Sequence, residues 1–426
     1  MKHYSYWLDT LAETPQFSTE HQELPRQADA VIVGAGYTGL SAARQLANAG
    51  ASVLVFDRDR IGFGASSRNG GQVLTGLKVD VDALVARRGE SEARALFNIS
   101  LDAIAALERL VAEEHIDCGC ERTGHIQAAA KPRHFEAMQR EQALLARVCH
   151  HEVRLVPQSA QRSELGTDRY FGLLVDERSV ALNPAQYVHG LAEAARRAGA
   201  ALHAGTSVQR IARAGSRWTV VTDRGDIQAG DVLFATNGYT NGAAPFLQRR
   251  LIPVGSYVVA TAPLGAAAAA RLVPKRRMVF DTKHFLYYFR VTRDHRLLFG
   301  GRAEFSKPTD ASTSRAAKTL HAGLLTIFPE LASVPIEYAW SGNVAFTRDQ
   351  MPRAGRIDGA YYAGGYCGHG VAMATYLGAL IGRRMAGEPI EHPFMDDRFP
   401  PIPLYRGTPW FLPLAGAYYR YLDLVD

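Results

Sequence analysis

The sequence feature that most constrains the fold is a glycine-rich turn directly after a short apolar run near the start of the chain. Residues 30–33 form this run, which is too short for a helix and is typical of a buried parallel strand. The turn carries a GxGxxG pattern through Gly34, Gly36 and Gly39, and residues 38–49 continue with the apolar spacing of a helix. Glycines at these positions permit a tight turn and a close approach of the backbone to a pyrophosphate. The pattern therefore predicts a dinucleotide-binding βαβ unit.

Asp57 strengthens this prediction because it directly follows a second apolar strand, residues 52–56. A carboxylate about twenty residues after the glycine turn can accept hydrogen bonds from the adenosine ribose, and it disfavours the 2′-phosphate of NADP. NAD-dependent dehydrogenases and flavoproteins share such a unit, so the unit alone leaves both classes open.

Composition narrows the remaining classes of protein. With 47% hydrophobic and 21% charged residues the chain is typical of a globular protein, and at 426 residues it is long enough for two domains. No apolar run approaches the roughly 20 residues that cross a bilayer, and the first twenty residues lack a secretion pattern, so a cytoplasmic protein is expected. The net charge of +6 is spread along the chain without interleaved aromatic residues, so nucleic acid is not an expected partner.

The cysteines and histidines do not predict a metal site. Cys118 and Cys120 lack the CxxC spacing of a zinc or redox pair. Cys149, His150 and His151 are consecutive, and three consecutive side chains of a regular element cannot all point at one ion. Free thiols in a reducing compartment are the simpler interpretation.

Several later segments follow one another in an order and spacing typical of a known enzyme family. They are IGFGASSRNGG at residues 61–71, FATNGY at 234–239, WSGNV at 340–344, MPRAGR at 351–356 and GGYCGHGV at 364–371. Together with the glycine-rich turn, these segments resemble the D-amino acid oxidase-type (DAO) family of FAD-dependent oxidoreductases, over about residues 28–390. The portion at 61–71 is most similar to members that act on γ-glutamylated amines.

The resemblance implies an α/β fold in which an antiparallel β-sheet substrate domain is inserted into a Rossmann-type FAD-binding domain of the glutathione reductase-like class. The FAD-binding domain is expected to comprise residues 25–113, 178–247 and 337–400, the substrate domain residues 114–177 and 248–336, and a C-terminal extension residues 401–426. This extension is aromatic and apolar between residues 410 and 421, so it can pack on its own core or on a neighbour, which leaves a homo-oligomer open.

The resemblance also implies noncovalent FAD and places it along the chain. The helix after the glycine-rich turn would aim its positive end at the pyrophosphate, and Arg68 would lie near the phosphate or flavin charge. The expected cofactor-binding residues are Gly34, Gly36, Tyr37, Thr38, Gly39, Asp57, Arg58, Ala65, Ser66, Ser67, Arg68, Asn69, Gly70, Gly71, Val208, Ala235, Thr236, Asn237, Gly342, Gly364, Gly365, Gly368, His369, Gly370 and Val371.

The candidate catalytic residues are Tyr288, Arg290, Tyr366 and His369. A helix that begins near His369 offers free amides to the negative charge that develops on a reduced flavin, and His369 itself is either a hydrogen-bond donor or a helix cap. Tyr366 is either a wall of the substrate cavity or a core aromatic. Tyr288, Arg290 and Arg302 alternate with apolar residues on expected strands, so they line the cavity or face solvent.

Val344 bears on the substrate. Family members that bind an amino acid carboxylate carry an arginine at this position of the motif that begins at Trp340, and a valine cannot bind a carboxylate. The sequence therefore favours a small-molecule amine, a polyamine or a γ-glutamylated amine, oxidised to an imine with electrons passing to oxygen or another acceptor. Arg290 could bind a carboxylate from another direction, so a D- or N-methyl amino acid stays open as a substrate. A flavin-binding subunit without turnover is a further alternative.

Overall fold

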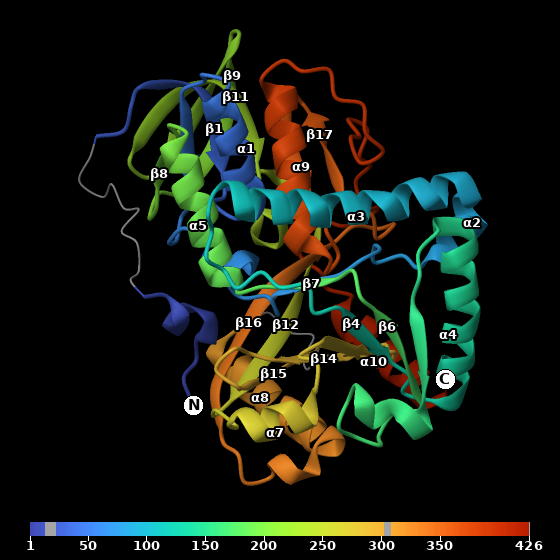
Figure 1. The fold of residues 1–426 in the computed structure, drawn as a ribbon. Helices are drawn as coiled ribbons and strands as arrows, with labels where there is room; N and C mark the ends of the chain where they lie inside the picture. The colour runs from blue at the N-terminus through green and yellow to red at the C-terminus, as the bar shows by residue number, and fades with distance from the viewer. Residues whose placement is uncertain (13–22, 302–307, 426) are drawn as a thin grey trace.

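Two eight-stranded sheets form the framework of the computed structural model, which describes residues 1–12, 23–301 and 308–425 (Figure 1). The first sheet has the strand order β17-β18-β11-β1-β2-β8, and β11 extends beyond its neighbours to pair with β10, which pairs with β9. Its strands are β1 (Gln27–Val33), β2 (Val53–Phe56), β8 (Ala201–His203), β9 (Val208–Ala214), β10 (Arg217–Thr222), β11 (Gly225–Phe234), β17 (Arg353–Ile357) and β18 (Ala360–Gly364).

The glycine-rich turn forms the predicted βαβ unit of this sheet. Strand β1 pairs in parallel with β2 on one side and with β11 on the other. Helix α1 (Tyr37–Asn48) connects β1 to β2. The turn begins at Gly34, whose φ of +105° favours glycine and whose added Cβ would lie 2.9 Å from the Ala235 carbonyl oxygen. The Rossmann-type fold class is thus confirmed, and the helix begins one residue before the predicted position.

Helices cover one face of the first sheet and the β9–β10 ribbon covers part of the other. The helical layer contains α1, α3 (Glu90–Glu113), α5 (Pro184–Arg197) and α9 (Gly370–Met385), with α3 crossing the middle of the molecule (Figure 1). Helices α1 and α9 pack closely because a Cβ at Gly378 would lie only 2.4 Å from the Thr38 carbonyl oxygen. Asn183 caps α5 as predicted, since its side chain accepts hydrogen bonds from the amides of Ala185 and Gln186.

The second sheet has the order β16-β12-β15-β14-β13-β4-β6-β5 and is antiparallel except where β4 pairs in parallel with β13. This one pair differs from the fully antiparallel sheet that the resemblance implied. The two strands are far apart in the chain, so no short hairpin fixes their relative direction. The strands are β4 (His125–Ala128), β5 (Arg154–Pro157), β6 (Gly172–Asp176), β12 (Ile252–Thr261), β13 (Met278–Asp281), β14 (Tyr287–Val291), β15 (Leu297–Gly301) and β16 (Ile336–Phe346).

Shorter elements connect and cover the two sheets. Helix α8 packs on β12, β15 and β16. Strand β16 lies in the second sheet, although the expected domain division placed a boundary within it, at residue 337. The domain division itself stays a prediction. The remaining elements are η1 (Tyr6–Thr10), η2 (Ala65–Ser67), β3 (Gln72–Val73), α2 (Val81–Arg88), α4 (Pro132–Leu144), η3 (Leu145–Cys149), η4 (Gln158–Ser163), β7 (Val180–Ala181), η5 (Asn237–Tyr239), α6 (Pro245–Gln248), α7 (Ala266–Leu272), α8 (Asp310–Ile327), η6 (Pro329–Leu331) and α10 (Leu412–Val425).

The C-terminal helix α10 packs on the connection between β13 and β14. The Asp423 carboxylate accepts hydrogen bonds from the amides of His284 and Phe285, at 2.8 and 2.9 Å. Leu414 and Tyr418 remain exposed on the same helix. Within residues 1–12, 23–301 and 308–425, no helix combines the length and the apolar character needed to cross a bilayer.

Candidate active site

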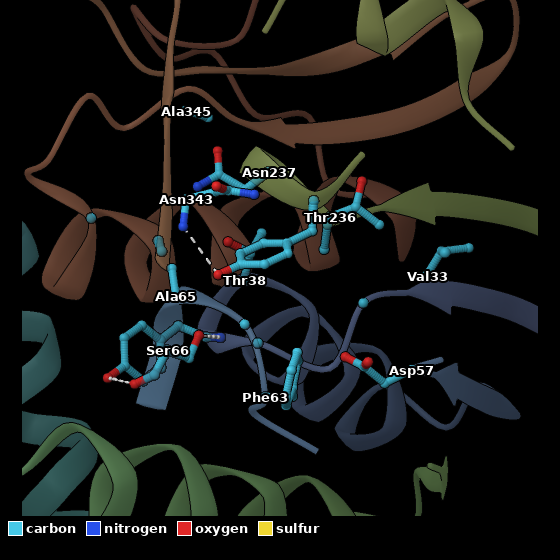
Figure 2. A pocket seen from close by; sticks show the side chains of 18 of the residues that line it. Val33, Thr38, Asp57, Phe63, Ala65, Ser66, Thr236, Asn237, Asn343 and Ala345 are labelled. Carbon is cyan, nitrogen blue, oxygen red and sulfur yellow. Dashed lines mark hydrogen bonds between the residues drawn. The ribbon is translucent and has the colours of Figure 1, made fainter. Parts of the chain in front are cut away.

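A cleft opens at the carboxyl ends of β1, β2 and β11, where the glycine-rich turn meets α1. Figure 2 shows Asp57, Thr38 and Asn237 around this cleft, together with Asn343 and Ala345 from β16. The predicted cofactor-binding residues that line it are Gly34, Gly36, Tyr37, Thr38, Asp57, Arg58, Ala65, Ser66, Asn69, Val208, Ala235, Thr236, Asn237, Gly368, Gly370 and Val371.

Asp57 is held at the end of β2 by backbone amides. Its carboxylate accepts hydrogen bonds from the amides of Ala35, at 2.9 Å, and Asp59, at 3.0 Å. Burial raises the pKa of this carboxyl, while the two amides oppose that shift. The carboxylate is thus fixed beside the cleft, at the place where an adenosine ribose would lie.

The N-terminus of α1 faces the cleft without a side-chain cap. Gly36 occupies the N-cap position, and the Tyr37 amide donates to the Ser66 hydroxyl at 3.1 Å. A Cβ at Gly36 would lie 2.8 Å from that hydroxyl oxygen, so glycine lets the turn and the loop at Ser66 lie close together. A helix end of this kind attracts a phosphate through its amides and its dipole. The residues of the cleft therefore fit a dinucleotide.

The loop at residues 65–71 is fixed by Trp340 of the WSGNV motif and by two N-terminal residues that the sequence did not single out. The Trp7 indole donates to the Asn69 carbonyl at 2.9 Å, and the Trp340 indole donates to the Arg68 carbonyl at 2.8 Å. The Ser5 hydroxyl adds a further hydrogen bond to this loop. An isolated aromatic residue near the N-terminus carries no sequence signal for such a contact.

The other predicted cofactor-binding residues lie around the cleft rather than in its lining. Gly39 packs inside α1, where an added Cβ would lie 2.0 Å from the Gly34 carbonyl oxygen, and Gly365 donates its amide to the Asn237 side chain at 2.9 Å. Ser67, Gly71 and Gly364 are buried beside these contacts, whereas Arg68, Gly70, Gly342 and His369 line a neighbouring cavity.

This second cavity, of about 310 Å³, lies between the first cleft and the second sheet. Tyr288 and His369, two of the candidate catalytic residues, line it. The two cavities adjoin each other, since both are lined by Ala65, Asn69, Asn343, Val344, Cys367, Gly368 and Val371. A flavin ring at this junction would face the second cavity, which is accordingly the candidate substrate cavity.

His369 and Tyr366 stand where the two cavities meet. His369 precedes α9 without capping it through its side chain, and its Nδ1 atom is buried with no hydrogen-bond partner among the described residues. Burial lowers the pKa of His369 to about 3, so the imidazole is neutral. Tyr366 lines the first cleft rather than the second cavity, and its hydroxyl bonds to that of Thr38.

Arg290 does not reach the substrate cavity. Its guanidinium donates to the carbonyl oxygens of Gly71, at 2.7 Å, and Leu182, at 2.9 Å, and lies over the Trp7 ring. Although Arg290 shares a strand face with Tyr288, it lies two residues farther along β14, and the loop at Gly71 covers it. Arg290 therefore holds the backbone at Gly71 and Leu182 and does not line the substrate cavity. Arg302, the other candidate arginine, lies outside the described residues.

The charged lining of the substrate cavity contains groups of both signs. Asp80, Glu141 and Asp176 contribute carboxyl groups, Lys78 contributes an ammonium group, and Arg68 contributes a guanidinium group. Burial, together with the neighbouring charges of Asp80 and Asp82, raises the pKa of Glu141 to about 7.

Val344 occupies the lining as the sequence motif suggested. It lies on β16, opposite Val254 of β12, and borders both cavities. Among the described residues, Arg68 is the only arginine in the lining of the substrate cavity. Its guanidinium is already bonded to the carbonyl oxygens of Phe63 and Ser341, and burial lowers its pKa.

The floor of the substrate cavity comes from the second sheet and was missed in the sequence. His125 and Gln127 of β4, Asp176 of β6 and Phe280 of β13 all line it. The alternation of polar and apolar residues over 125–128 was the available signal, but a short alternating strand does not reveal which cavity its polar face borders. His151, considered above as a metal ligand, instead bonds to Asp176 at 2.7 Å.

Comparison with known proteins agrees with this arrangement. Residues 29–384 match the family model described as DAO, FAD dependent oxidoreductase. The chain is 32% identical to gamma-glutamylputrescine oxidoreductase of Escherichia coli (strain K12), over 98% of each chain. It is 33% identical to the probable oxidoreductase OrdL of Rhizobium meliloti (strain 1021), over 91% of this chain and 89% of the relative.

Solved structures agree on the fold. Glycine oxidase from Geobacillus kaustophilus superimposes with a TM-score of 0.75 at 20% identity, covering 89% of this chain and 99% of that one. The glycine-rich cleft, the uncapped end of α1 and the matched family model lead to one conclusion. The chain belongs to the DAO family of FAD-dependent oxidoreductases, which act on amines and amino acids.

Proposed function

We propose that this enzyme oxidises the carbon–nitrogen bond of a polyamine or a γ-glutamylated amine. The product is an imine, which water hydrolyses to an aldehyde and a smaller amine or ammonia. The observation that carries the proposal is Val344, which stands in the cavity lining where an amino acid oxidase of this family would need an arginine for the substrate carboxylate. The name of the Escherichia coli relative, gamma-glutamylputrescine oxidoreductase, supports the same substrate class.

The charges of the cavity also support an amine. Arg290, which could have replaced the missing arginine, is bonded to the carbonyl oxygens of Gly71 and Leu182. Asp176 adds negative charge to the lining, since its hydrogen bonds from His151 and Thr75 help to hold its pKa at about 2, and negative charge attracts an ammonium group. A simple α-amino acid would have to place its carboxylate near this group with no free arginine among the described residues to bind it.

The cofactor site follows from the first cleft. We propose that the predicted residues that line this cleft hold FAD, with its pyrophosphate at the end of α1 and its ribose at Asp57. FAD, when bound, supplies the group that accepts the hydride. The remaining task of the chain is to hold the amine carbon beside the flavin, and Tyr288 and His369 border that position. The amides at the start of α9 would stabilise negative charge at the same junction.

Anaerobic mixing of the purified enzyme with a panel of amines tests this function. Putrescine, longer polyamines and γ-glutamylputrescine should bleach the flavin absorbance near 450 nm, whereas glycine, D-alanine and sarcosine should bleach it much more slowly. Oxygen added afterwards shows whether peroxide forms. If the amino acids bleach the flavin faster than every amine, the proposed substrate class is wrong.

The attachment of FAD is tested separately by acid precipitation. We expect the yellow colour to stay in the supernatant, because no bond to the protein is expected. Colour in the pellet would contradict noncovalent binding.

A further inference from the structure

His125 presents one edge of its imidazole to the substrate cavity. Strand β4 alternates its side chains, so that Ile126 and Ala128 pack in the core of the second sheet while His125 and Gln127 line the cavity. His125 is only 5% exposed, and it stacks on Phe280 with 5.3 Å between ring centroids. Its ring orientation is therefore fixed by packing.

Ser179 fixes the position of the proton on this ring. The Ser179 hydroxyl oxygen lies 2.8 Å from His125 Nδ1 and accepts a hydrogen bond from the Thr75 amide at 3.1 Å. Among the described residues, Nδ1 is the only acceptor within reach of the Ser179 hydroxyl proton. Ser179 therefore donates to Nδ1, and the neutral ring carries its own proton on Nε2.

The Nε2–H group has no partner of its own. No described residue forms a hydrogen bond with it, and the atom is open to the cavity that His125 lines. Burial lowers the pKa of His125, which keeps the ring neutral. His125 thus offers the cavity a hydrogen-bond donor and no lone pair, so it cannot act there as a proton acceptor.

The neighbouring groups do not satisfy this donor. Asp176 pairs with His125 across the sheet, but its carboxylate already accepts hydrogen bonds from Thr75, His151 and the amide of Arg178. Gln127 follows on the same face, and its amide has no hydrogen bond to any described residue. His125 and Gln127, neighbours on one face of β4, are therefore both available to bind polar groups of a ligand.

The chemistry of the donor distinguishes two kinds of amine. A free polyamine whose far nitrogen is protonated offers only donors, which would leave the buried Nε2–H unpaired. An N-acylated diamine carries a carbonyl oxygen, which accepts from Nε2–H, and an amide group, which the Gln127 side chain can complement. Sites that bind a polar group in this way discriminate strongly against analogues that lack it.

We propose that His125 is a specificity-determining residue, whose Nε2–H group binds the carbonyl oxygen of the acyl group when the substrate is a γ-glutamylated or otherwise N-acylated diamine. This inference rests on the proposed amine oxidation and assigns a residue to the acyl group of that substrate class. Ser179 is the positioning residue, because it selects the tautomer that places the proton on Nε2.

Two probes of equal charge and chain length test the inference. N-acetylputrescine carries the carbonyl, and 4-ethoxybutylamine has a methylene in its place and an ether oxygen in place of the amide nitrogen, so its far end is also uncharged. The apparent Kd and the limiting rate of anaerobic flavin reduction are measured for both. For the unaltered enzyme we expect at least tenfold tighter binding of N-acetylputrescine.

Variants assign this preference to His125. His125→Phe keeps the stacking on Phe280 and should abolish the preference by weakening the binding of N-acetylputrescine alone, with little effect on the limiting rate. His125→Gln, which retains an N–H donor, should keep part of it, and Ser179→Ala should reduce it. His134→Phe is the matched control, because His134 bonds to Thr282 outside the cavity lining and its loss should leave the preference unchanged.

The outcomes separate this inference from the proposed function. If amines bleach the flavin but bind equally with and without the carbonyl, or if His125→Phe weakens both probes alike, the role of His125 is refuted while amine oxidation stands. If no amine bleaches the flavin, the proposed function fails and the inference fails with it. Should His125→Phe not retain FAD, the His125→Gln and Ser179→Ala variants decide the question.

Discussion

The hydroxyl oxygen of Tyr366 lies 2.6 Å from that of Thr38, and this hydrogen bond joins the first turn of α1 to the loop before α9. The two residues are 328 positions apart in the sequence, and both line the cofactor cleft. Burial raises the pKa of the Tyr366 hydroxyl, so the phenol keeps its proton. The bond therefore sets the spacing between the two helix ends that face the cofactor.

Tyr366→Phe should weaken FAD binding by about five- to tenfold, because the variant loses one buried hydrogen bond across the cleft. Fluorescence quenching during titration of the apoprotein with FAD measures the affinity. Tyr257→Phe removes a comparable buried hydroxyl contact, between β12 of the second sheet and Ser312 of α8, and should leave the FAD affinity unchanged. Equal losses in the two variants would contradict the spacing role.

Gly39→Ala should yield protein with little bound flavin and a lower Tm. The new Cβ would lie 2.0 Å from the Gly34 carbonyl oxygen, so the glycine-rich turn would have to move away from α1. The ratio of absorbance at 450 nm to that at 280 nm reports the bound flavin. Gly242→Ala is the control, since no heavy atom lies within 4 Å of its added Cβ. A fully loaded Gly39→Ala enzyme would show that the turn tolerates a side chain.

Arg290→Met should destabilise the protein by about 2–4 kcal/mol without a selective rise in the KM for amines. The loss leaves the buried carbonyl oxygens of Gly71 and Leu182 without their charged donor. Thermal unfolding and steady-state kinetics measure the two effects. Arg293→Met, which removes an exposed ion pair to Glu121, should be nearly neutral. A stable Arg290→Met variant with a selectively raised KM would restore the cavity role expected from the sequence.

Val344→Arg should lower kcat/KM for amines by at least tenfold. The new guanidinium would bring positive charge and bulk to the junction of the two cavities, where it repels an ammonium substrate. Rates of anaerobic flavin reduction measure the effect. Val344→Leu keeps the site apolar and should lose much less. If both variants lose the same activity, volume rather than charge governs this position.

Glu141→Gln should stabilise the protein at neutral and higher pH. The pKa of Glu141 is raised to about 7, so its neutral form is favoured in the folded state. The penalty for the charged form is absent at low pH, grows between about pH 4.5 and pH 7, and is constant above. The gain should be about 1–2 kcal/mol at pH 8, after solvent screening in the half-buried site, and small at pH 4.5.

Unfolding curves at both pH values measure this gain. The exposed Glu136 on the same helix provides the control variant Glu136→Gln, which should change little at either pH. A pH-independent effect of Glu141→Gln would mean that Glu141 does not titrate in this range.

The cofactor half of the molecule could be predicted from sequence because its signals are local. The turn at Gly34, the helix after it and Asp57 lie within thirty residues, and local backbone conformation explains the position of each. The late helix α9 was equally predictable, since a glycine-rich turn precedes it and Gly387 follows it. The helices α4 and α8 were missed, because the apolar spacing of their sequences is weak.

The substrate half could not be predicted in the same way, because its contacts join distant segments. His125, Asp176 and Phe280 meet only through the pairing of β4 with β6 and β13. Contacts with a distant segment also explain why the prediction for Arg290 was wrong. Its position on an alternating strand suggested the cavity, but the loop at Gly71 covers its guanidinium.

The strand order of the first sheet has a consequence for biosynthesis. Its members come from residues 27–56, 201–234 and 353–364, and α9 ends only at Met385. A nascent chain on the ribosome therefore lacks one wall of the cleft until most of the protein has been translated. Stable capture of the flavin should therefore follow the synthesis of α9, and messages truncated before codon 370 should yield colourless polypeptides.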